Sequence, residues 1–465
     1  MIKEVNIEKL YGVFNHNIKL KEDNITLILG ENGLGKTIIL KMIKALFDND
    51  FYELGKHDFD NFTIILNDDS SFEITKSKRN AESLKLYRRI EDYKIDVFYK
   101  KSKDSKTKKN KTNSFSLKSE TIYENYRHGR EPRHRKFMRM DLFHILKNHI
   151  PVPIDRVGNE RIIDLSIGKV YSSYEIIDKY SEYLPLEIID LVSNESVPEW
   201  FTSLTKNIKV KLVETQRLLA KQKSDDSEYK SAVIQCSEEL KGIIRTKSLE
   251  ATNFTSKLDR TYTNRLIQKV TSKNNTTISK IEKSLEDLEG KRNFLIKVGL
   301  LEKDDESINS ISNIDHNANE VEILKDVLEI YIDDSNEKLK IYDELSKKLN
   351  TLMEIINKRF NYKRLTINKH EGFLFFSTIT EKIIPLENLS SGEQHELVLF
   401  YELLFNTPSN SIILIDEPEI SLHISWQNEF INDIREIIGI NEIFAIIATH
   451  SPDIINNNWK LTVQL

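Results

Sequence analysis

A glycine-rich loop between an apolar run and an amphipathic run is the feature that most limits the fold of this chain. The apolar run is Ile25 to Leu29, and the loop after it reads Gly30-Glu31-Asn32-Gly33-Leu34-Gly35-Lys36-Thr37. Residues 38–47 then place apolar side chains at helical spacing. Strand, glycine loop and helix in this order predict a phosphate-binding loop at the edge of an α/β sheet.

This loop predicts a site for the phosphates of a nucleotide. Glycines let successive backbone N–H groups turn inward, and the helix N-terminus adds a dipole that favours anions. We expect Lys36 to reach the β- and γ-phosphates and the Thr37 hydroxyl to ligate Mg²⁺. The cofactors are therefore predicted to be ATP and Mg²⁺. The residues expected to hold the nucleotide here are Asn32, Gly33, Gly35, Lys36 and Thr37.

A second apolar run, near the other end of the chain, finishes in two acids. It reads Ser411-Ile412-Ile413-Leu414-Ile415-Asp416-Glu417. Parallel strands of open α/β sheets bind ligands at their carboxyl ends. We therefore expect Asp416 to hold Mg²⁺ and Glu417 to polarise the attacking water as a general base. Taken alone, the two acids are also explained as the cap of a following helix.

A third segment narrows the class. Residues 389–395, Leu-Ser-Ser-Gly-Glu-Gln-His, precede a helical stretch and resemble the signature motif of ABC-type ATPases. In that family the serine and glycine bind the γ-phosphate that the opposite subunit holds. The resemblance thus makes Ser391 and Gly392 ligands in trans. From the residue types alone, the segment is equally well explained as a helix cap.

Two shorter fragments extend the resemblance to ABC-type ATPases. Residues 419–423 resemble the D-loop at the dimer seam, and residues 449–452, Thr-His-Ser-Pro, resemble the segment of the switch histidine. The resemblance implies that His450 contacts the γ-phosphate and acts in catalysis. The glutamine that touches Mg²⁺ in this family has no clear counterpart, because no glutamine precedes Gln216. Asn159-Glu160-Arg161 is a position for it that we leave unassigned.

The glycine loop and the signature segment are separated by about 350 residues, more than one intervening subdomain requires. Residues 61–76 alternate as two strands about a turn at Asn67 to Ser71. We therefore expect an α/β fold: an ABC-type P-loop NTPase head, with a mixed sheet and an antiparallel β-lobe, carrying a long helical or coiled-coil insertion. The expected units are the N-terminal part of the head (1–175), the insertion (176–360) and the C-terminal part of the head (361–465).

Helical periodicity dominates the insertion. Three helices are predicted there, over residues 204–246, 271–301 and 320–360. The last is the clearest, with interruptions at Ser335 and Lys338, and could reach roughly 60 Å at 1.5 Å per residue. The first is its expected antiparallel partner, which would make the insertion an arm. A compact helical bundle is the alternative.

Composition limits the cellular compartment and the partner classes that we expect for the chain. The charged fraction is 30%, the mean hydropathy is -0.45 and no apolar run is long enough to span a bilayer. The first residues lack the basic and apolar regions of a signal peptide. We predict a cytoplasmic protein with no membrane partner. The net charge of -5 does not indicate a nucleic-acid binder, although residues 100–111 and 127–136 are locally basic.

The segments Asp-Glu-Pro-Glu-Ile-Ser-Leu-His and Ala-Thr-His-Ser-Pro together are similar to the bacterial defence ATPases of the OLD, Septu and PARIS group. The resemblance implies an ATP-hydrolysing homo-oligomer of head dimers. Such a protein acts as a sensor or scaffold that controls a separate effector, with a nucleic acid or a phage protein as trigger. Fifteen residues follow His450, so we expect the effector to be another chain rather than a C-terminal nuclease. A DNA-engaging repair or chromosome-maintenance ATPase, and a scaffold that barely hydrolyses ATP, remain alternatives.

Overall fold

The computed structural model describes most of the chain in separate segments. These are residues 1–78, 93–101, 112–118, 122, 143, 146–147, 150, 152–157, 161–164, 169–172, 180, 197–213, 219–220, 230–271, 277–303 and 318–465. Both locally basic stretches lie almost entirely outside them, as do Asn159 and Glu160. In the described part, no helix combines the length and apolarity needed to cross a membrane.

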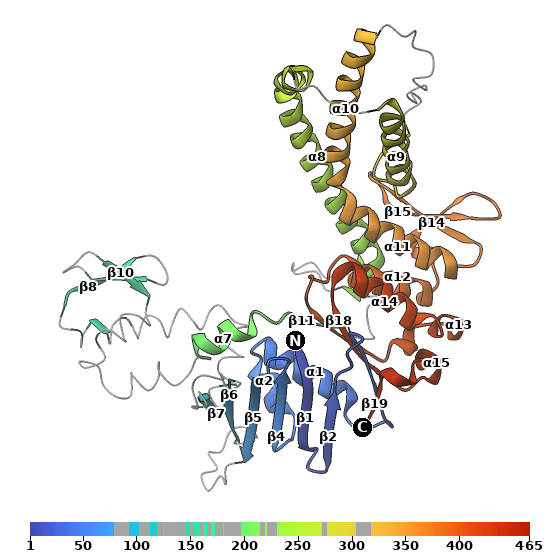
Figure 1. Ribbon diagram of the computed structural model, residues 1–465. Coiled ribbons are helices and arrows are strands. Elements are labelled where there is room, and N and C mark those ends of the chain that lie inside the picture. Colours follow the sequence, from blue (N-terminus) through green and yellow to red (C-terminus); the bar gives the residue numbers. More distant parts are fainter. Residues whose placement is uncertain are drawn as a thin grey trace.

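A five-stranded parallel sheet is the centre of the head (Figure 1). Its strand order is β11-β17-β18-β3-β19, and every neighbouring pair is parallel. The strands are β3 (Ile25–Leu29), β11 (Val210–Val213), β17 (Ile412–Asp416), β18 (Phe444–Thr449) and β19 (Thr462–Gln464). All five residues of β17 are buried, as expected for a parallel sheet covered on both faces.

Successive residues of the central strands belong to two different hydrophobic cores. In β17, Ile412 and Leu414 pack with α1 (Lys36–Phe47) and α2 (Phe51–Lys56). Ile413 and Ile415 pack with α11 (Asp343–Arg359), α12 (Ser391–Leu404) and α14 (Phe430–Asn441). This alternation follows from the two-residue period of a strand. It places α1 and α12 on opposite faces of the sheet.

The antiparallel lobe adjoins the α1 face. Its strand order is β2-β1-β4-β5-β6-β7. The strands are β1 (Ile2–Leu10), β2 (Phe14–Lys19), β4 (Asn61–Leu66), β5 (Ser71–Lys78), β6 (Tyr93–Lys100) and β7 (Thr112–Lys118). The hairpin predicted over residues 61–76 is confirmed as β4 and β5. Asp69 in its turn has a φ of 58°, and Asp68 Oδ1 accepts a hydrogen bond from the Ser70 N–H at 3.1 Å.

The remaining elements are short. Two small antiparallel sheets are formed by β8 (Ile154–Val157), β9 (Arg161–Asp164) and β10 (Lys169–Ser172), and by β14 (Lys363–Asn368), β15 (Gly372–Ser377) and β16 (Ile383–Ile384). The two-stranded β12 (Leu219–Ala220) and β13 (Lys230–Ser231) precede the long helices. The short helices are α7 (Glu199–Thr205), η3 (Leu386–Asn388), η4 (Pro418–Ser421), α13 (Ile424–Gln427), α15 (Pro452–Ile455) and η5 (Trp459–Leu461).

Long helices project from the head as an arm (Figure 1). They are α8 (Ala232–Thr271), α9 (Ile278–Lys297) and α10 (Ala318–Lys340), and α10 packs against both others. Arg265 of α8 forms an ion pair with Asp334 of α10, and Lys269 contacts Glu329 at 2.8 Å. The expected helical insertion is present. Its partner helix is α8 rather than the helix predicted over residues 204–246.

The helix predicted over residues 320–360 is two helices. It breaks at Ile341 and Tyr342, whereas the predicted interruptions, Ser335 and Lys338, lie inside α10. Tyr342 is buried, and its N–H bonds the Leu339 carbonyl in a turn. Packing explains the difference, because α11 lies against α12 and α14 in the head core while α10 belongs to the arm. A single lever of 41 residues therefore does not form.

The helix predicted over residues 204–246 was wrong in its first half. The helix α7 ends at Thr205, and α8 begins only at Ala232. Between them, β11 pairs in parallel with β17, from Val210 with Ile412 to Val213 with Ile415. An open edge of the central sheet therefore overrides the helical periodicity. Because β11 falls within the 176–360 unit, four residues of the predicted insertion lie in the head sheet; the three-part division itself stays a prediction.

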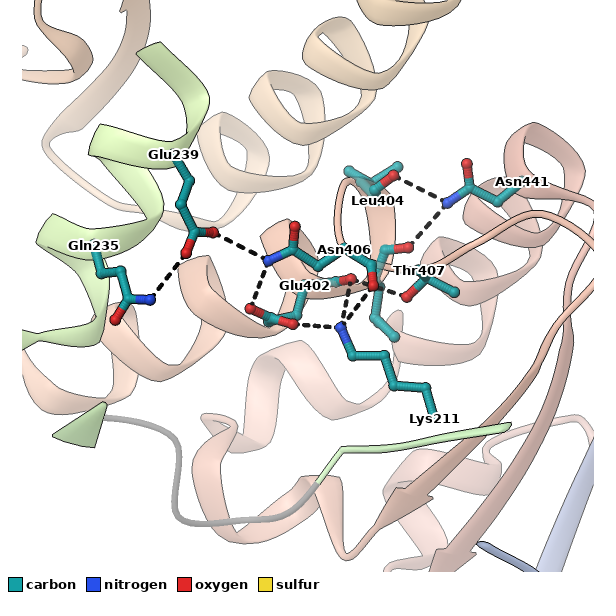
Figure 2. A network of polar contacts seen from close by, with 9 residues as sticks. Lys211, Gln235, Glu239, Glu402, Leu404, Asn406, Thr407 and Asn441 are labelled. Atoms are coloured by element: carbon teal, nitrogen blue, oxygen red, sulfur yellow. Dashed lines mark hydrogen bonds and ion pairs between the residues drawn. The ribbon is translucent and has the colours of Figure 1, made fainter. Parts of the chain in front are cut away.

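Side chains from several elements complete the C-terminal end of α12 (Figure 2). Lys211 of β11 donates to the Asn406 carbonyl at 3.0 Å and forms an ion pair with Glu402. Asn441 of α14 donates to the Leu403 and Leu404 carbonyls at 2.9 and 3.1 Å. These bonds satisfy carbonyls that a helix end leaves without partners. The Asn406 side chain also donates to Glu239 of α8 at 3.2 Å, which joins the helix end to the arm.

A buried charge cluster ties α11 to α12 and α14. Arg359, the last residue of α11, forms ion pairs with Glu396 of α12 and Asp433 of α14. All three residues are buried. The guanidinium also lies 5.0 Å from the centre of the Phe400 ring. Burial lowers the pKa of Arg359 to about 10, so the group stays cationic at neutral pH and is shared by the two carboxylates.

Replacing Arg359 with methionine should destabilise the head strongly, because it leaves two buried carboxylates without a cation. Loss of one partner of a buried pair costs about 3–5 kcal/mol of unfolding free energy. The control is Lys358→Met, since Lys358 is exposed and pairs with Glu429 at the surface; its effect should stay within about 0.5 kcal/mol. Urea unfolding of both variants measures the difference. Equal stability of the two would contradict a structural role for the cluster.

Candidate functional site

The glycine loop lies between β3 and α1, as predicted. Gly33 and Gly35 have φ values of 92° and 91°, which residues other than glycine rarely adopt. A Cβ atom on Gly35 would also stand 2.5 Å from Leu10 Cδ2, so this position requires glycine twice over. Asn32 and Gly33 are exposed at the loop tip. The helix α1 begins at Lys36 without a side-chain cap, which leaves its first N–H groups available to an anion.

Lys36 lies folded into the loop. Its ammonium donates to the carbonyls of Gly30 and Glu31 at 2.8 and 3.1 Å. Lys36 as a whole is 4% exposed. Burial lowers the pKa of Lys36, while the nearby carboxylates of Glu417, Glu419 and Asp416 oppose that shift. The cation is therefore held at the loop with three acids close by.

Thr37 and Asp416 meet although they are far apart in the sequence. The Thr37 hydroxyl donates to Asp416 Oδ1 at 3.1 Å, which joins the start of α1 to the end of β17. Burial raises the pKa of Asp416, the neighbouring Glu417 and Glu419 raise it further, and the Thr37 bond opposes them. A hydroxyl and a carboxylate in contact are oxygen ligands of the kind that Mg²⁺ takes alongside nucleotide phosphates. The pair fits that ion.

His450 lies between the lysine and the second acid. Its Nδ1 is 3.2 Å from Lys36 Nζ, and its Nε2 is 3.4 Å from Glu417 Oε1. An ammonium can only donate, so Nδ1 accepts, and the ring proton is on Nε2 and faces Glu417. Glu417 has a φ of 44°. A left-handed backbone at a residue other than glycine is a local strain that occurs at functional sites.

The signature segment is a helix cap in this chain, through Ser390. The Glu393 N–H donates to Ser390 Oγ at 3.3 Å, and the Ser390 N–H donates to Glu393 Oε2 at 2.8 Å. Lys363 of β14 binds both Glu393 oxygens, at 2.8 and 2.6 Å. The capping explanation therefore holds for Ser390 and leaves Ser391 exposed at the helix start. Since α12 and α1 lie on opposite faces of the sheet, Ser391 and Gly392 do not join the Lys36 cluster within one chain.

Comparison with known proteins places this chain in a family. A family model described as AAA ATPase domain matches residues 1–455. The chain belongs to this AAA ATPase family. It is accordingly an ATPase.

Individual similarities to this AAA ATPase are more distant. Protein ea59 of Escherichia phage lambda is 29% identical over 144 residues, which are 27% of this chain and 26% of ea59. The chain thus spans about a quarter of the length of that relative. Two solved structures cover 98% of this chain and 90% of their own: the Smc head domain of Pyrococcus furiosus bound to the C-terminal domain of ScpA, at 12% identity and a TM-score of 0.31, and the SMC head domain of Thermotoga maritima, at 10% and 0.29.

Two residues that sequence reasoning missed contact the site of this AAA ATPase. His16 of β2 donates from Nε2 to the Leu34 carbonyl at 2.9 Å, which supports the glycine loop from the lobe. Glu419 accepts a hydrogen bond from the His450 N–H at 2.6 Å. Alternation in β2 could have indicated that His16 points inward with Ile18. No local pattern indicates that Glu419 reaches a residue 31 positions away.

His16 should make the stability of this AAA ATPase fall in acid. Burial lowers the pKa of His16 below its ordinary 6.5, so the unfolded chain takes up a proton at a higher pH than the folded chain does. The contribution of neutral His16 to the free energy of unfolding is therefore present above about pH 6.5 and is lost as pH falls below that value. His16→Phe keeps the ring but cannot titrate. The difference in unfolding free energy between wild type and His16→Phe should therefore shrink between about pH 7 and pH 5. A constant difference in urea unfolding would exclude this assignment.

Proposed function

We propose that the ATPase works through two composite sites that form when two copies of the head pair. The observation that carries this proposal is the division of the site residues. Lys36, Thr37, Asp416, Glu417 and His450 gather at one end of the central sheet, whereas the signature serine starts a helix on the other face. A Cβ on Gly392 would have no heavy atom within 4 Å, so this helix start is open to a ligand from outside the chain.

Within each half-site the residues divide the work by chemistry. The glycine loop, with Asn32, Gly33 and Gly35, and Lys36 bind the phosphates of ATP through N–H groups and one cation. Thr37 and Asp416 hold Mg²⁺, which neutralises phosphate charge when bound. Glu417 follows Asp416 at the end of the strand. It orients the attacking water and accepts its proton. His450 donates from Nε2 toward Glu417 and can turn that donor to a γ-phosphate oxygen.

The second copy supplies the signature helix. Ser391 offers an exposed hydroxyl, and Gly392 follows it in the first turn of α12, where N–H groups favour an anion. The D-loop, residues 419–423, lies beside the acids and exposes Ile420 to 67%. An apolar side chain of this exposure next to a half-built site supports burial against a second head.

Mixing two inactive variants tests the sharing of sites. Lys36→Ala should lose nucleotide binding, and Ser391→Arg should keep binding by one head while blocking closure. Their mixture contains pairs with one intact composite site, so it should recover ATPase activity that neither variant has alone. Glu417→Gln is the control for chemistry, because it should bind ATP yet lower turnover by at least about a hundredfold. A mixture as inactive as its components would contradict sharing in trans.

The arm gives the signature helix a connection to other molecules. Lys363, Arg359 and the Glu239–Asn406 bond attach α12 to α11, β14 and α8. We propose that a partner bound to the arm shifts α12 and thereby controls pairing of the heads. We propose on this basis a cytoplasmic sensor that governs a separate effector, of the kind found in the OLD, Septu and PARIS group, with a resemblance to the stand-alone PARIS subunit AriA. A head-dimer homo-oligomer and a phage-derived trigger belong to the same proposal.

One observation favours a DNA-engaging ATPase as the second candidate. From Arg245 to Thr271, α8 has six basic residues and two acidic ones. Two of the basic residues face acids of α10, as described above, whereas Arg245, Lys257 and Arg260 are exposed. Threonine, serine and asparagine fill much of the rest of this segment. Arginine, lysine and small polar side chains are those that contact phosphates along a duplex.

Charge reversal on α8 distinguishes the candidates. If DNA binds there, duplex should stimulate turnover, and Arg245→Glu with Lys257→Glu and Arg260→Glu should weaken duplex binding while lowering the salt slope by about 0.9 per lost phosphate contact. Lys347→Glu is the matched control, since Lys347 is exposed on α11. Fluorescence anisotropy at several salt concentrations measures both quantities. Unchanged binding by the triple variant, or turnover insensitive to DNA, would favour the sensor.

A further inference from the structure

Glu419 connects the D-loop to the switch histidine. It lies in η4, three residues after Asp416, and its side chain crosses to the next strand end. Its Oε1 accepts a hydrogen bond from the backbone N–H of His450 at 2.6 Å. Hydrogen bonds to a carboxylate are shorter and stronger than those between neutral groups. The contact therefore sets the position of the His450 main chain, and with it the origin of the imidazole ring.

A second bond holds the same two segments together. The Gln427 side chain, which is 7% exposed, donates to the Leu422 and Glu419 carbonyls at 3.2 and 3.4 Å. Its Oε1 accepts from the Ser451 hydroxyl at 2.6 Å. Residues 419–427 and residues 450–451 are thus joined at two points by partly buried polar groups. Polar networks of this kind favour one geometry, because breaking any member leaves a group without a partner.

Glu419 also belongs electrostatically to the site. Its charge opposes the burial shift of Lys36 and adds to the raised pKa of Asp416. Its second oxygen, Oε2, is buried without a hydrogen-bond partner in the described part of the chain. A carboxylate kept in this position, with one oxygen unsatisfied, is costly for stability alone. The cost suggests a role in function.

The outer side of the same segment is apolar and exposed. Ile420 is 67% and Ile424 is 66% exposed, on either side of the D-loop residues 421–423. A second head that covers these two side chains would press on the segment whose inner side holds His450.

We propose that Glu419 is a positioning residue, which holds the His450 main chain so that the ring stays between Lys36 and Glu417, and that Gln427 makes the D-loop and the switch histidine move as one unit. The inference rests on the ATPase site proposed above. It assigns no chemical step to Glu419, since Glu417 remains the base. Contact between heads at Ile420 and Ile424 then reaches His450 within the same chain through two side chains.

The hydrogen bond can be separated from the charge by two substitutions. Glu419→Ala removes the acceptor and should lower kcat at least about tenfold while KM for ATP stays within about threefold, because misplacement of a reacting group acts on the transition state more than on binding. Glu419→Gln keeps an acceptor oxygen for the His450 N–H and should retain most of the wild-type kcat. Glu22→Ala, an exposed acid that precedes β3 and thus lies before the strand end opposite the glycine loop, is the matched control.

Steady-state ATPase kinetics of the full chain, with thermal unfolding of each variant, decide the matter. Wild-type kcat in Glu419→Ala would overturn the inference, and so would a Glu419→Gln variant as slow as Glu419→Ala. If Glu419→Ala does not fold, Gln427→Met replaces it: it cuts the second connection at similar volume and should lower kcat without raising KM. Glu417→Gln separates a failure of the proposed ATPase site from a failure of the positioning role. If it hydrolyses ATP normally, the proposed site fails; if it is inactive while Glu419→Ala is normal, only the positioning role fails.

Discussion

Parallel pairing between β3 and β18 is the constraint on which the rest of the molecule depends. It aligns Leu29 with Thr449, residues from opposite ends of the chain, and β17 continues the same register on the other side. Because carboxyl ends of parallel strands share one edge, the glycine loop, the acids and His450 must emerge together. The Thr37–Asp416 hydrogen bond is a consequence of that register. Without the pairing, each motif would be an isolated loop.

The signature helix depends on a different set of forces. Its first turns are held by Lys363 and Arg359, and its last turn by Lys211 and Asn441, so polar contacts from four other elements define its position. Asn406, just after the helix, adds a contact with the arm through Glu239 of α8. Charged groups of this kind contribute little net stability, but breaking one is costly. The helix is therefore oriented firmly with respect to the arm, which gives the insertion a physical route to the helix that we propose to complete the site of a second head.

Much of the head was predictable because its patterns are local. The strand at Ile25–Leu29, the loop at Lys36 and the acid-terminated strand at Asp416 each read correctly, since apolar runs, glycines and acids act within a few residues. The insertion was less predictable. Helical periodicity over residues 320–360 could not indicate that Tyr342 turns the chain, because the break arises where α11 enters the head core. Residues 210–213 became a strand because β17 offered an open edge.

The sequence alone determined the local elements of a split α/β head, and with them the residues that we propose to bind phosphate, hold a divalent cation and activate water. Those properties belong to single side chains and short spacings. Tertiary structure alone decided that Glu419 reaches His450 and that His16 supports the glycine loop. Such contacts depend on backbone segments brought together across the sheet, and no local pattern encodes the distance between them.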